Sequence, residues 1–220
     1  MSNMAVTRHP PIRDQIAGIL RSAIVNLDFA PGQLLVERNL CELTQASRPS
    51  VREALRQLEA EGLVESHNGR GTIVRVISAE EAAQVYEVRA ELEGLAARLF
   101  TERATDDQRE ALREALGELA AAIREEKPSK QILAAQADFY RILFEGSGNP
   151  FLDRTVQGMQ VRIAQLRATT LAVPGRAAAS LEEFEQIAER IGAGDAEGAR
   201  RSAIEHVRRA GEAMVIARSE

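Results

Sequence analysis

Residues 45–62 read QASRPSVREALRQLEAEG and decide the fold, because they contain both ends of one helix. Ser47 can cap the start, since its hydroxyl accepts from the free N–H groups of a first turn, and Pro49 is tolerated just inside it. Gly62 is typical of a helix C-terminus. Arg48 and Arg52 lie four residues apart near the positive end of the helix dipole, where a cation does not stabilise the helix. The two arginines therefore predict an anionic partner that binds from outside the chain.

The residues around this helix predict a winged helix-turn-helix domain. Apolar residues recur at helical spacing on its N-terminal side, where Pro31-Gly32 supplies a turn, and two β-type runs flank the hairpin tip HNGRG on its C-terminal side. Three helices and two strands are expected, over residues 11–27, 36–43, 47–61, 63–66 and 72–76. We therefore expect a flexible arm over residues 1–10 and a DNA-binding domain over residues 11–77.

Beyond residue 77 every periodic segment is helical. Residues 78–82 are expected to form a linker, and residues 83–220 a helical domain. Capping signals at Thr105 with Gln108 and at Asp195 mark two of the helix starts. The expected helices cover residues 79–103, 105–127, 131–146, 151–171, 181–191 and 195–214. About six helices with short loops predict an antiparallel bundle, so the chain as a whole is expected to be mainly α.

The overall composition is that of a soluble globular protein and narrows the classes of function. The chain has a formal net charge of −5, 45% hydrophobic residues and a single cysteine, Cys41, which excludes an intrachain disulfide. No apolar run approaches the roughly 20 residues that span a bilayer, and the segment MSNMAVTRHPP lacks the apolar core of a signal peptide. We therefore expect a cytoplasmic protein without a membrane partner.

The front domain is expected to contact double-stranded DNA through the second helix of its helix-turn-helix, residues 47–61. In this class of domain that helix enters the major groove. Arg48 and Arg52 share one helical face, with Ser50 beside them, and arginine can bind guanine through two parallel hydrogen bonds. Arg38, in the preceding helix, is placed to contact a phosphate. The arginine of the tip HNGRG can reach the backbone or the minor groove. A single arginine is more often only solvated, which we expect of Arg56.

The segment PGQLLVERNLCELTQASRPSVREALRQLEAEGLVESHNGRGTIV resembles the DNA-binding domain of the GntR family of bacterial regulators. The family pattern is PG-x-x-L-x-E-x-x-L, a Ser/Thr-Arg turn, V-R-E-A-L-x-x-L-x-x-x-G-L and a G-x-G wing. The resemblance implies DNA contacts at Arg38, Ser47, Arg48, Ser50, Arg52, Asn68 and Gly69, to which we add Arg70 of the wing. Pro49 stands where some members have a small polar residue, which can shift the operator sequence.

The helical part resembles the FCD effector domain of FadR-like members, in the stretches EVRAELEGLAARL, FYRILFEGSGNPFL and IGAGDAEGARRSAIEHV. Most such domains bind a divalent metal through an Asp, a His four residues on and two later histidines. Aligned on GSGNP, these positions hold Gln136, Tyr140, Phe184 and His206. Zn²⁺ needs three or four N, O or S ligands, which this set does not provide. We therefore expect no metal and no cofactor.

The same positions suggest a pocket for an organic effector. Gln136 and Tyr140 lie one turn apart on one helical face, His206 can add a donor, Arg89 a charge and Phe184 an apolar wall. Buried polar groups in a bundle are costly unless they are paired. A small carboxylate or amide ligand would pair them, although the same residues could also satisfy one another without any ligand.

Taken together, these features predict a DNA-binding transcriptional regulator, in particular a repressor. It is expected to bind a pseudo-palindromic operator as a homodimer and to change its operator affinity when a small carboxylate-bearing metabolite binds the bundle. The alternative is a bundle that only dimerises or responds to a protein partner. An enzyme is not expected, because the bundle offers no cysteine and one histidine. A non-specific nucleic-acid binder is disfavoured by the pI near 5.5 and by 4% aromatic residues.

Overall fold

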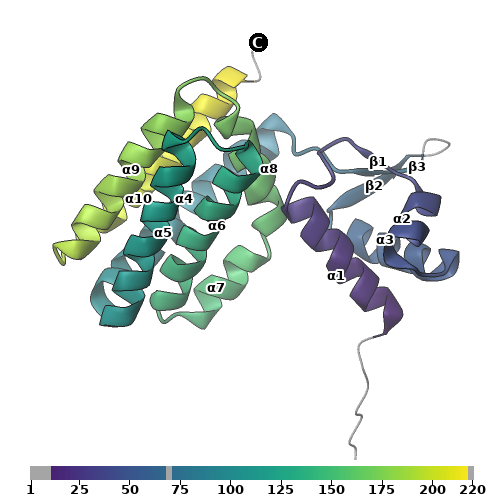
Figure 1. Cartoon of the computed structure of the whole chain (residues 1–220), viewed down its shortest axis with the longest axis horizontal. Coiled ribbons are helices and arrows are strands. Elements are labelled where there is room, and N and C mark those ends of the chain that lie inside the picture. Colours follow the sequence, from purple (N-terminus) through teal and green to yellow (C-terminus); the bar gives the residue numbers. More distant parts are fainter. Residues whose placement is uncertain (1–10, 68–70, 218–220) are drawn as a thin grey trace, which may run out of the picture. The chain divides into compact units, whose positions relative to one another are not determined.

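A computed structural model describes residues 11–67 and 71–217 and divides the chain into two compact units, at the boundary between Val76 and Ile77 (Figure 1). The boundary lies one residue from the expected one. The wing residues Asn68, Gly69 and Arg70 and the arm of residues 1–10 lie outside the described residues. In the part that is described, no helix is long and apolar enough to cross a membrane.

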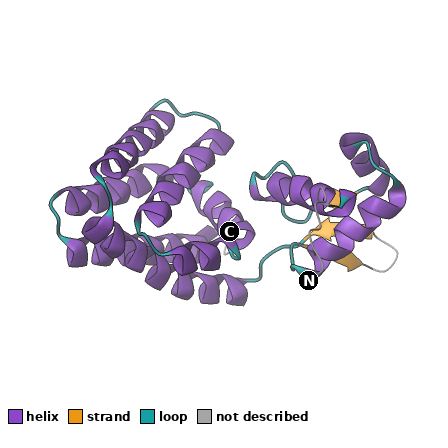
Figure 2. Ribbon diagram, turned by 90° about the horizontal axis from the view of Figure 1, so that it is seen from below, coloured by secondary structure: helices purple, strands orange, loops and turns teal. Residues whose placement is uncertain are grey.

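The first unit is a winged helix-turn-helix, with helices on a small antiparallel sheet (Figure 2). Its elements are α1 Ile12–Val25, β1 Leu34–Leu35, α2 Glu37–Thr44, α3 Arg48–Ala60, β2 Val64–His67 and β3 Gly71–Val74. The strand order is β1-β3-β2, and Leu34 of β1 pairs with Ile73 of β3. Strand β1 is not among the expected elements, because two leucines after a turn carry no strand signal of their own. They become a strand only when β3 supplies a partner.

Helix α3 begins and ends as its sequence predicts. The Ser47 hydroxyl accepts a hydrogen bond from the backbone N–H of Ser50, at 3.4 Å. Gly62 follows the helix with φ +71°, a conformation that glycine adopts without strain. Val51, Leu55 and Leu58 bury the apolar side of the helix, which packs against α1. The opposite side is left to polar residues.

The second unit is entirely helical in the described residues (Figures 1 and 2). Its helices are α4 Ala79–Arg103, α5 Asp106–Arg124, α6 Ser129–Gly146, α7 Pro150–Gln157, α8 Gln160–Leu171, α9 Arg176–Gly192 and α10 Ala196–Ala217. Helix α10 packs along α4 and α9, and α5 packs against α6. The expected bundle is confirmed, with seven helices in the described residues where about six were expected.

The main differences from the sequence prediction lie between α7 and α8, in the expected linker and at the start of α9. The expected helix 151–171 is divided into α7 and α8, because glycine is a weak helix former and Gly158 ends α7. Helix α4 covers the expected residues 79–103, so the residues 79–82 of the expected linker are helical, and Ser78 caps the helix through the N–H of Glu81. Helix α9 begins at Arg176 rather than at residue 181, directly after Gly175 with φ +75°.

Candidate DNA-binding surface and effector cavity

The α3 arginines and the end of α2 form a polar surface on the first unit. Arg48 and Arg52 project from the first two turns of α3, with 69% and 61% of their side chains exposed. Arg38 on α2 is 78% exposed and lies 3.8 Å from Glu42. Ser47 and Ser50 share a hydrogen bond of 2.9 Å between their hydroxyls at the start of α3. The five residues expected to contact DNA in the described part are thus brought to α2 and the start of α3.

Glu37, the first residue of α2, holds the two α3 arginines. Its carboxylate accepts from Arg52 Nε at 2.8 Å, and its other oxygen lies 3.9 Å from Arg48 Nε. The hydrogen bond to Glu37 raises the pKa of Arg52 above its ordinary value. The sequence prediction missed this partner, although Glu37 occupies the Glu of the pattern PG-x-x-L-x-E. The arginines therefore have an internal anion before any DNA is bound.

In the second unit, one cavity is lined by all five residues expected to bind an effector. Arg89 comes from α4, Gln136 and Tyr140 from α6, Phe184 from α9 and His206 from α10. The remaining lining residues are Arg167, Thr170, Leu171, Arg176, Ala177, Ser180 and Ala210. The cavity is partly open to solvent, and its volume is about 20 Å³, which is room for one or two water molecules. A larger ligand requires lining side chains to move.

One side of the cavity is an ion-pair cluster between α4 and α8. Arg89 Nε donates to Glu93 Oε1 at 3.0 Å, and both side chains are only 2% exposed. Arg167 Nη2 lies 3.6 Å from the same carboxylate oxygen, and the guanidinium stands 3.9 Å from the Tyr140 ring centroid. Burial opposes the charge on Glu93, but the neighbouring arginines outweigh it and hold the pKa of Glu93 below its ordinary value. The carboxylate is therefore ionised.

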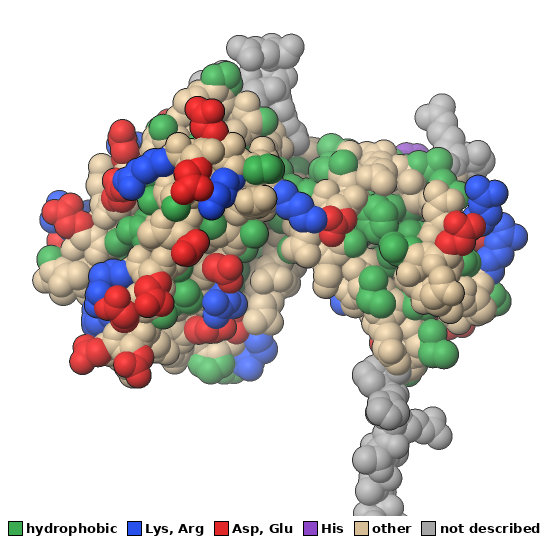
Figure 3. All heavy atoms as spheres, viewed as in Figure 1, with side chains coloured by type: hydrophobic (Ala, Val, Ile, Leu, Met, Phe, Trp, Pro, Cys, Tyr) green, Lys and Arg blue, Asp and Glu red, His purple; other side chains and the backbone are tan. Residues whose placement is uncertain are grey.

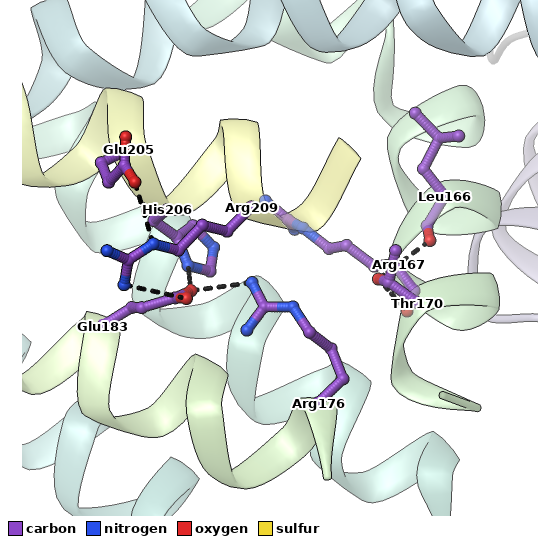
Figure 4. A network of polar contacts seen from close by, with 8 residues as sticks. All are labelled: Leu166, Arg167, Thr170, Arg176, Glu183, Glu205, His206 and Arg209. Carbon is purple, nitrogen blue, oxygen red and sulfur yellow. Dashed lines mark hydrogen bonds and ion pairs between the residues drawn. The ribbon is translucent and has the colours of Figure 1, made fainter. Parts of the chain in front are cut away.

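The other side of the cavity is centred on the Glu183 carboxylate (Figure 4). Glu183 Oε2 lies 2.6 Å from His206 Nδ1 and accepts from Arg176 Nη2 at 2.7 Å, while Oε1 lies 3.7 Å from Arg209. Burial opposes ionisation, but the hydrogen bonds from His206 and Arg176 outweigh it and keep the pKa of Glu183 below its ordinary value. Burial also lowers the pKa of His206, so the imidazole is neutral near pH 7.

Several buried polar atoms at this cavity have no hydrogen-bond partner within the described residues. They are Arg89 Nη1, Gln136 Oε1, Arg176 Nε and Arg176 Nη1. Most buried polar groups in proteins are paired with protein or ordered water, so such a concentration is unusual. Three arginines line the cavity, Arg89, Arg167 and Arg176, and the two carboxylates paired with them, Glu93 and Glu183, leave one excess positive charge among these five residues.

Two family models match this chain. Residues 12–74 match the model of the bacterial regulatory proteins of the gntR family, and residues 84–209 match the FCD domain. This chain belongs to the GntR family. It is a DNA-binding transcriptional regulator with an FCD domain, not an enzyme.

Relatives and solved structures agree with this assignment over most of the chain. The HTH-type transcriptional regulator YdhC of Bacillus subtilis is 26% identical over 206 residues, 94% of this chain and 92% of that protein. The HTH-type transcriptional repressor NanR of an Enterobacter species is 29% identical over 198 residues, 81% of this chain and 73% of that protein. The structure of E. coli McbR/YncC has the same fold, with a TM-score of 0.79 at 22% identity, and covers 96% of this chain and 99% of that one.

The residues present do not fit the divalent metal that the FCD resemblance implies. Phe184 has no ligand atom, and burial raises the pKa of Tyr140 far above its ordinary value, so the phenol stays protonated. His206 directs Nδ1 to Glu183. Among the described residues, no group of three His, Cys, Asp or Glu side chains could hold a metal ion. Arginines surround the cavity instead.

The sequence prediction missed four charged residues of this GntR-family cavity. They are Glu93, Arg167, Arg176 and Glu183. Glu93 carried one available signal, its position four residues after Arg89 on the same helical face. The other three come from two further helices, so only the packing of α8 and α9 brings them to the site.

On the face of the second unit seen in Figure 3, acidic and basic side chains are interspersed over the surface.

Proposed function

We propose that this GntR-family regulator is a repressor that binds a pseudo-palindromic operator as a homodimer and releases it when a carboxylate-bearing metabolite fills the FCD cavity. The observation that carries the effector part is the set of buried polar atoms without partners around that cavity. A ligand that pairs them removes a large desolvation cost. The excess of arginine over carboxylate favours a negatively charged ligand.

The DNA-binding part is supported by the surface at the start of α3. Arg48 and Arg52 are exposed on the helix that this class of domain inserts into the major groove. A dimer places two such helices about one turn of DNA apart, which corresponds to a pseudo-palindromic operator. The relative NanR is named a repressor, and this supports repression rather than activation here.

The connection of the two parts supports a response to the effector. Helix α4 carries Arg89 and Glu93 of the cavity and begins at Ala79, directly after the DNA-binding unit ends at Val76. Because the cavity is small, a metabolite can enter only with a rearrangement of its walls. Such a rearrangement changes operator affinity if the metabolite binds the two arrangements with different affinity.

Operator selection tests the DNA-binding part. We would select binding sites from a random duplex library and measure affinity by fluorescence anisotropy at fixed salt. Arg48→Ala and Arg52→Ala are expected to weaken specific binding by about 1–3 kcal/mol and to relax specificity at one position each. Arg56→Ala, an exposed residue of the same helix, is the control with little effect. Binding without sequence preference and with a steep salt dependence would indicate a non-specific binder instead.

A carboxylate panel tests the effector part. Acetate, L-lactate, succinate and D-gluconate are added at constant ionic strength, and the melting temperature and the operator affinity are measured. At least one carboxylate is expected to raise the melting temperature, since a ligand that binds only the folded state stabilises it, and to weaken operator binding. No response to any of them would favour the alternative, a bundle that only dimerises or answers a protein partner.

A further inference from the structure

The N-terminus of α9 faces the cavity and offers backbone donors to an anion. Arg176 and Ala177, the first two residues of α9, and Ser180 line the cavity. Gly175 at the cap position has no side chain to accept from the first turn. The N–H of Arg176 bonds the carbonyl of Val173 and that of Ala179 bonds Gly175, but no acceptor is found for the N–H of Ala177 within the described residues. The positive end of the helix dipole therefore meets the cavity with a free donor.

The Arg176 side chain gives a second, independent indication of a ligand at the same place. It is 9% exposed, and only its Nη2 is engaged, in the bond to Glu183 Oε2. The Nε and Nη1 atoms are buried without any acceptor in the described residues. A guanidinium is always charged in proteins and carries no acceptor of its own, so these donors need an acceptor that the described residues do not supply, from a ligand or from ordered water.

We propose that Arg176 and the first turn of α9 form the anchor that holds the carboxylate of the effector. One carboxylate oxygen accepts from the free donors of the Arg176 guanidinium, and the other from the N–H of Ala177. The anchor rests on the proposed function, because it names where in that cavity the anionic group binds. In this anchor, a guanidinium and a helix N-terminus supply the positive charge. The resemblance assigns that charge to a metal ion.

Glu183 fixes the anchor in place. It takes the Nη2 edge of Arg176 and is itself held by His206, so the guanidinium cannot turn away from the cavity without breaking the bond of 2.7 Å. Of the remaining unpaired atoms at the cavity, Arg89 Nη1 is a donor and Gln136 Oε1 is an acceptor. The Gln136 oxygen suits a hydroxyl or amine donor elsewhere on a ligand whose carboxylate is bound at α9.

Calorimetry on the full chain tests the anchor with a charge-matched pair of variants. The probe is the member of the carboxylate panel that raises the wild-type melting temperature most. Arg176→Gln is expected to raise its Kd at least about tenfold, because a charged hydrogen-bond donor is removed. Arg124→Gln removes the same charge from a 67% exposed arginine of the same unit and is expected to leave the Kd within about twofold.

A measurement on the wild-type chain keeps the test valid if Arg176→Gln does not fold. With ¹⁵N-alanine labelling, the amide proton of Ala177 is expected to move downfield on addition of the carboxylate, as an N–H that gains a charged acceptor does. The matching amide of the probe, such as lactamide for L-lactate, is expected to leave it in place. Equal Kd values for wild type and Arg176→Gln, or an unmoved Ala177 amide in a saturated complex, would overturn the anchor alone. A wild-type chain that binds no carboxylate would overturn the anchor and the proposed effector together.

Discussion

Replacement of Glu93 by glutamine is expected to destabilise the FCD unit strongly. Glu93 is 2% exposed, bonds Arg89 Nε at 3.0 Å and lies 3.6 Å from Arg167. Glu93→Gln keeps the shape but leaves two guanidinium groups without their counter-ion. Removal of one partner from a buried ion pair typically costs about 3–5 kcal/mol, because the remaining charge stays desolvated. Domain stabilities are about 5–15 kcal/mol, so this loss is a large fraction of the total.

Urea unfolding followed by near-UV circular dichroism measures this loss in the FCD unit alone. The chain has no tryptophan and two tyrosines, Tyr86 and Tyr140, both in the second unit, so the tyrosine signal reports on that unit. The control is Glu91→Gln, which removes a 64% exposed partner of Arg200 and is expected to cost less than about 1 kcal/mol. A Glu93→Gln chain that unfolds within 1 kcal/mol of that control, at an unchanged m-value, would refute the reasoning.

A second arm separates desolvation from packing. The double variant Arg89→Met with Glu93→Leu removes both charges and fills the same space with apolar atoms. It is expected to regain the part of the lost stability that comes from the uncompensated Arg89, since apolar replacements of buried ion pairs are often neutral or stabilising, while Arg167 still lacks its carboxylate. The same double variant removes a lining charge of the cavity, so its affinity for a carboxylate is expected to fall. Stability and ligand affinity would then change in opposite directions.

Two further predictions concern acid and the packing between helices. The pKa of His206 is lowered by burial from 6.5, and that of Glu183 is lowered from 4.5 because hydrogen bonds outweigh burial. The unfolded chain therefore binds more protons below these values, so the melting temperature should fall as the pH drops from 7 to 4, and a constant value would contradict the assignment. Gly146→Ala should lower the free energy of unfolding by about 1–3 kcal/mol, because an added Cβ would overlap the buried Phe100 ring. In the control Gly117→Ala, the added Cβ meets no atom within 4 Å, so this variant should not be destabilised. Thermal melts of both variants measure the difference.

Most helices could be predicted from the sequence because their signals are local. The Ser47 cap and the capping box of Thr105 with Gln108 are present in the structure as expected. Strand β1, the break between α7 and α8 and the early start of α9 could not be predicted in the same way. They depend on partners distant in the sequence or on the weak preference of one glycine, which the periodicity of apolar residues does not reveal.

The candidate cavity was predicted in part for a similar reason. Gln136, Tyr140, Phe184 and His206 were found through the spacing of a family pattern, and the structure brings them to one cavity. Arg176 lies before the expected helix 181–191, since nothing in the stretch VPGRAAA indicates that the first turn of α9 faces inward. Its importance follows from contacts with Glu183, seven residues later, which only the folded chain specifies.

The contact of Glu37 with Arg52 has a consequence for how the protein searches DNA. The carboxylate accepts from Arg52 Nε at 2.8 Å, so a duplex that takes this donor must displace an anion that belongs to the protein. An isolated phosphate replaces one negative partner by another and gains little from the exchange. A guanine edge that offers two acceptors in the right geometry gains more. With the DNA-binding role proposed for α3, Glu37 competes with DNA for Arg52, which shortens residence on random sequence and leaves the longest dwell times to the operator.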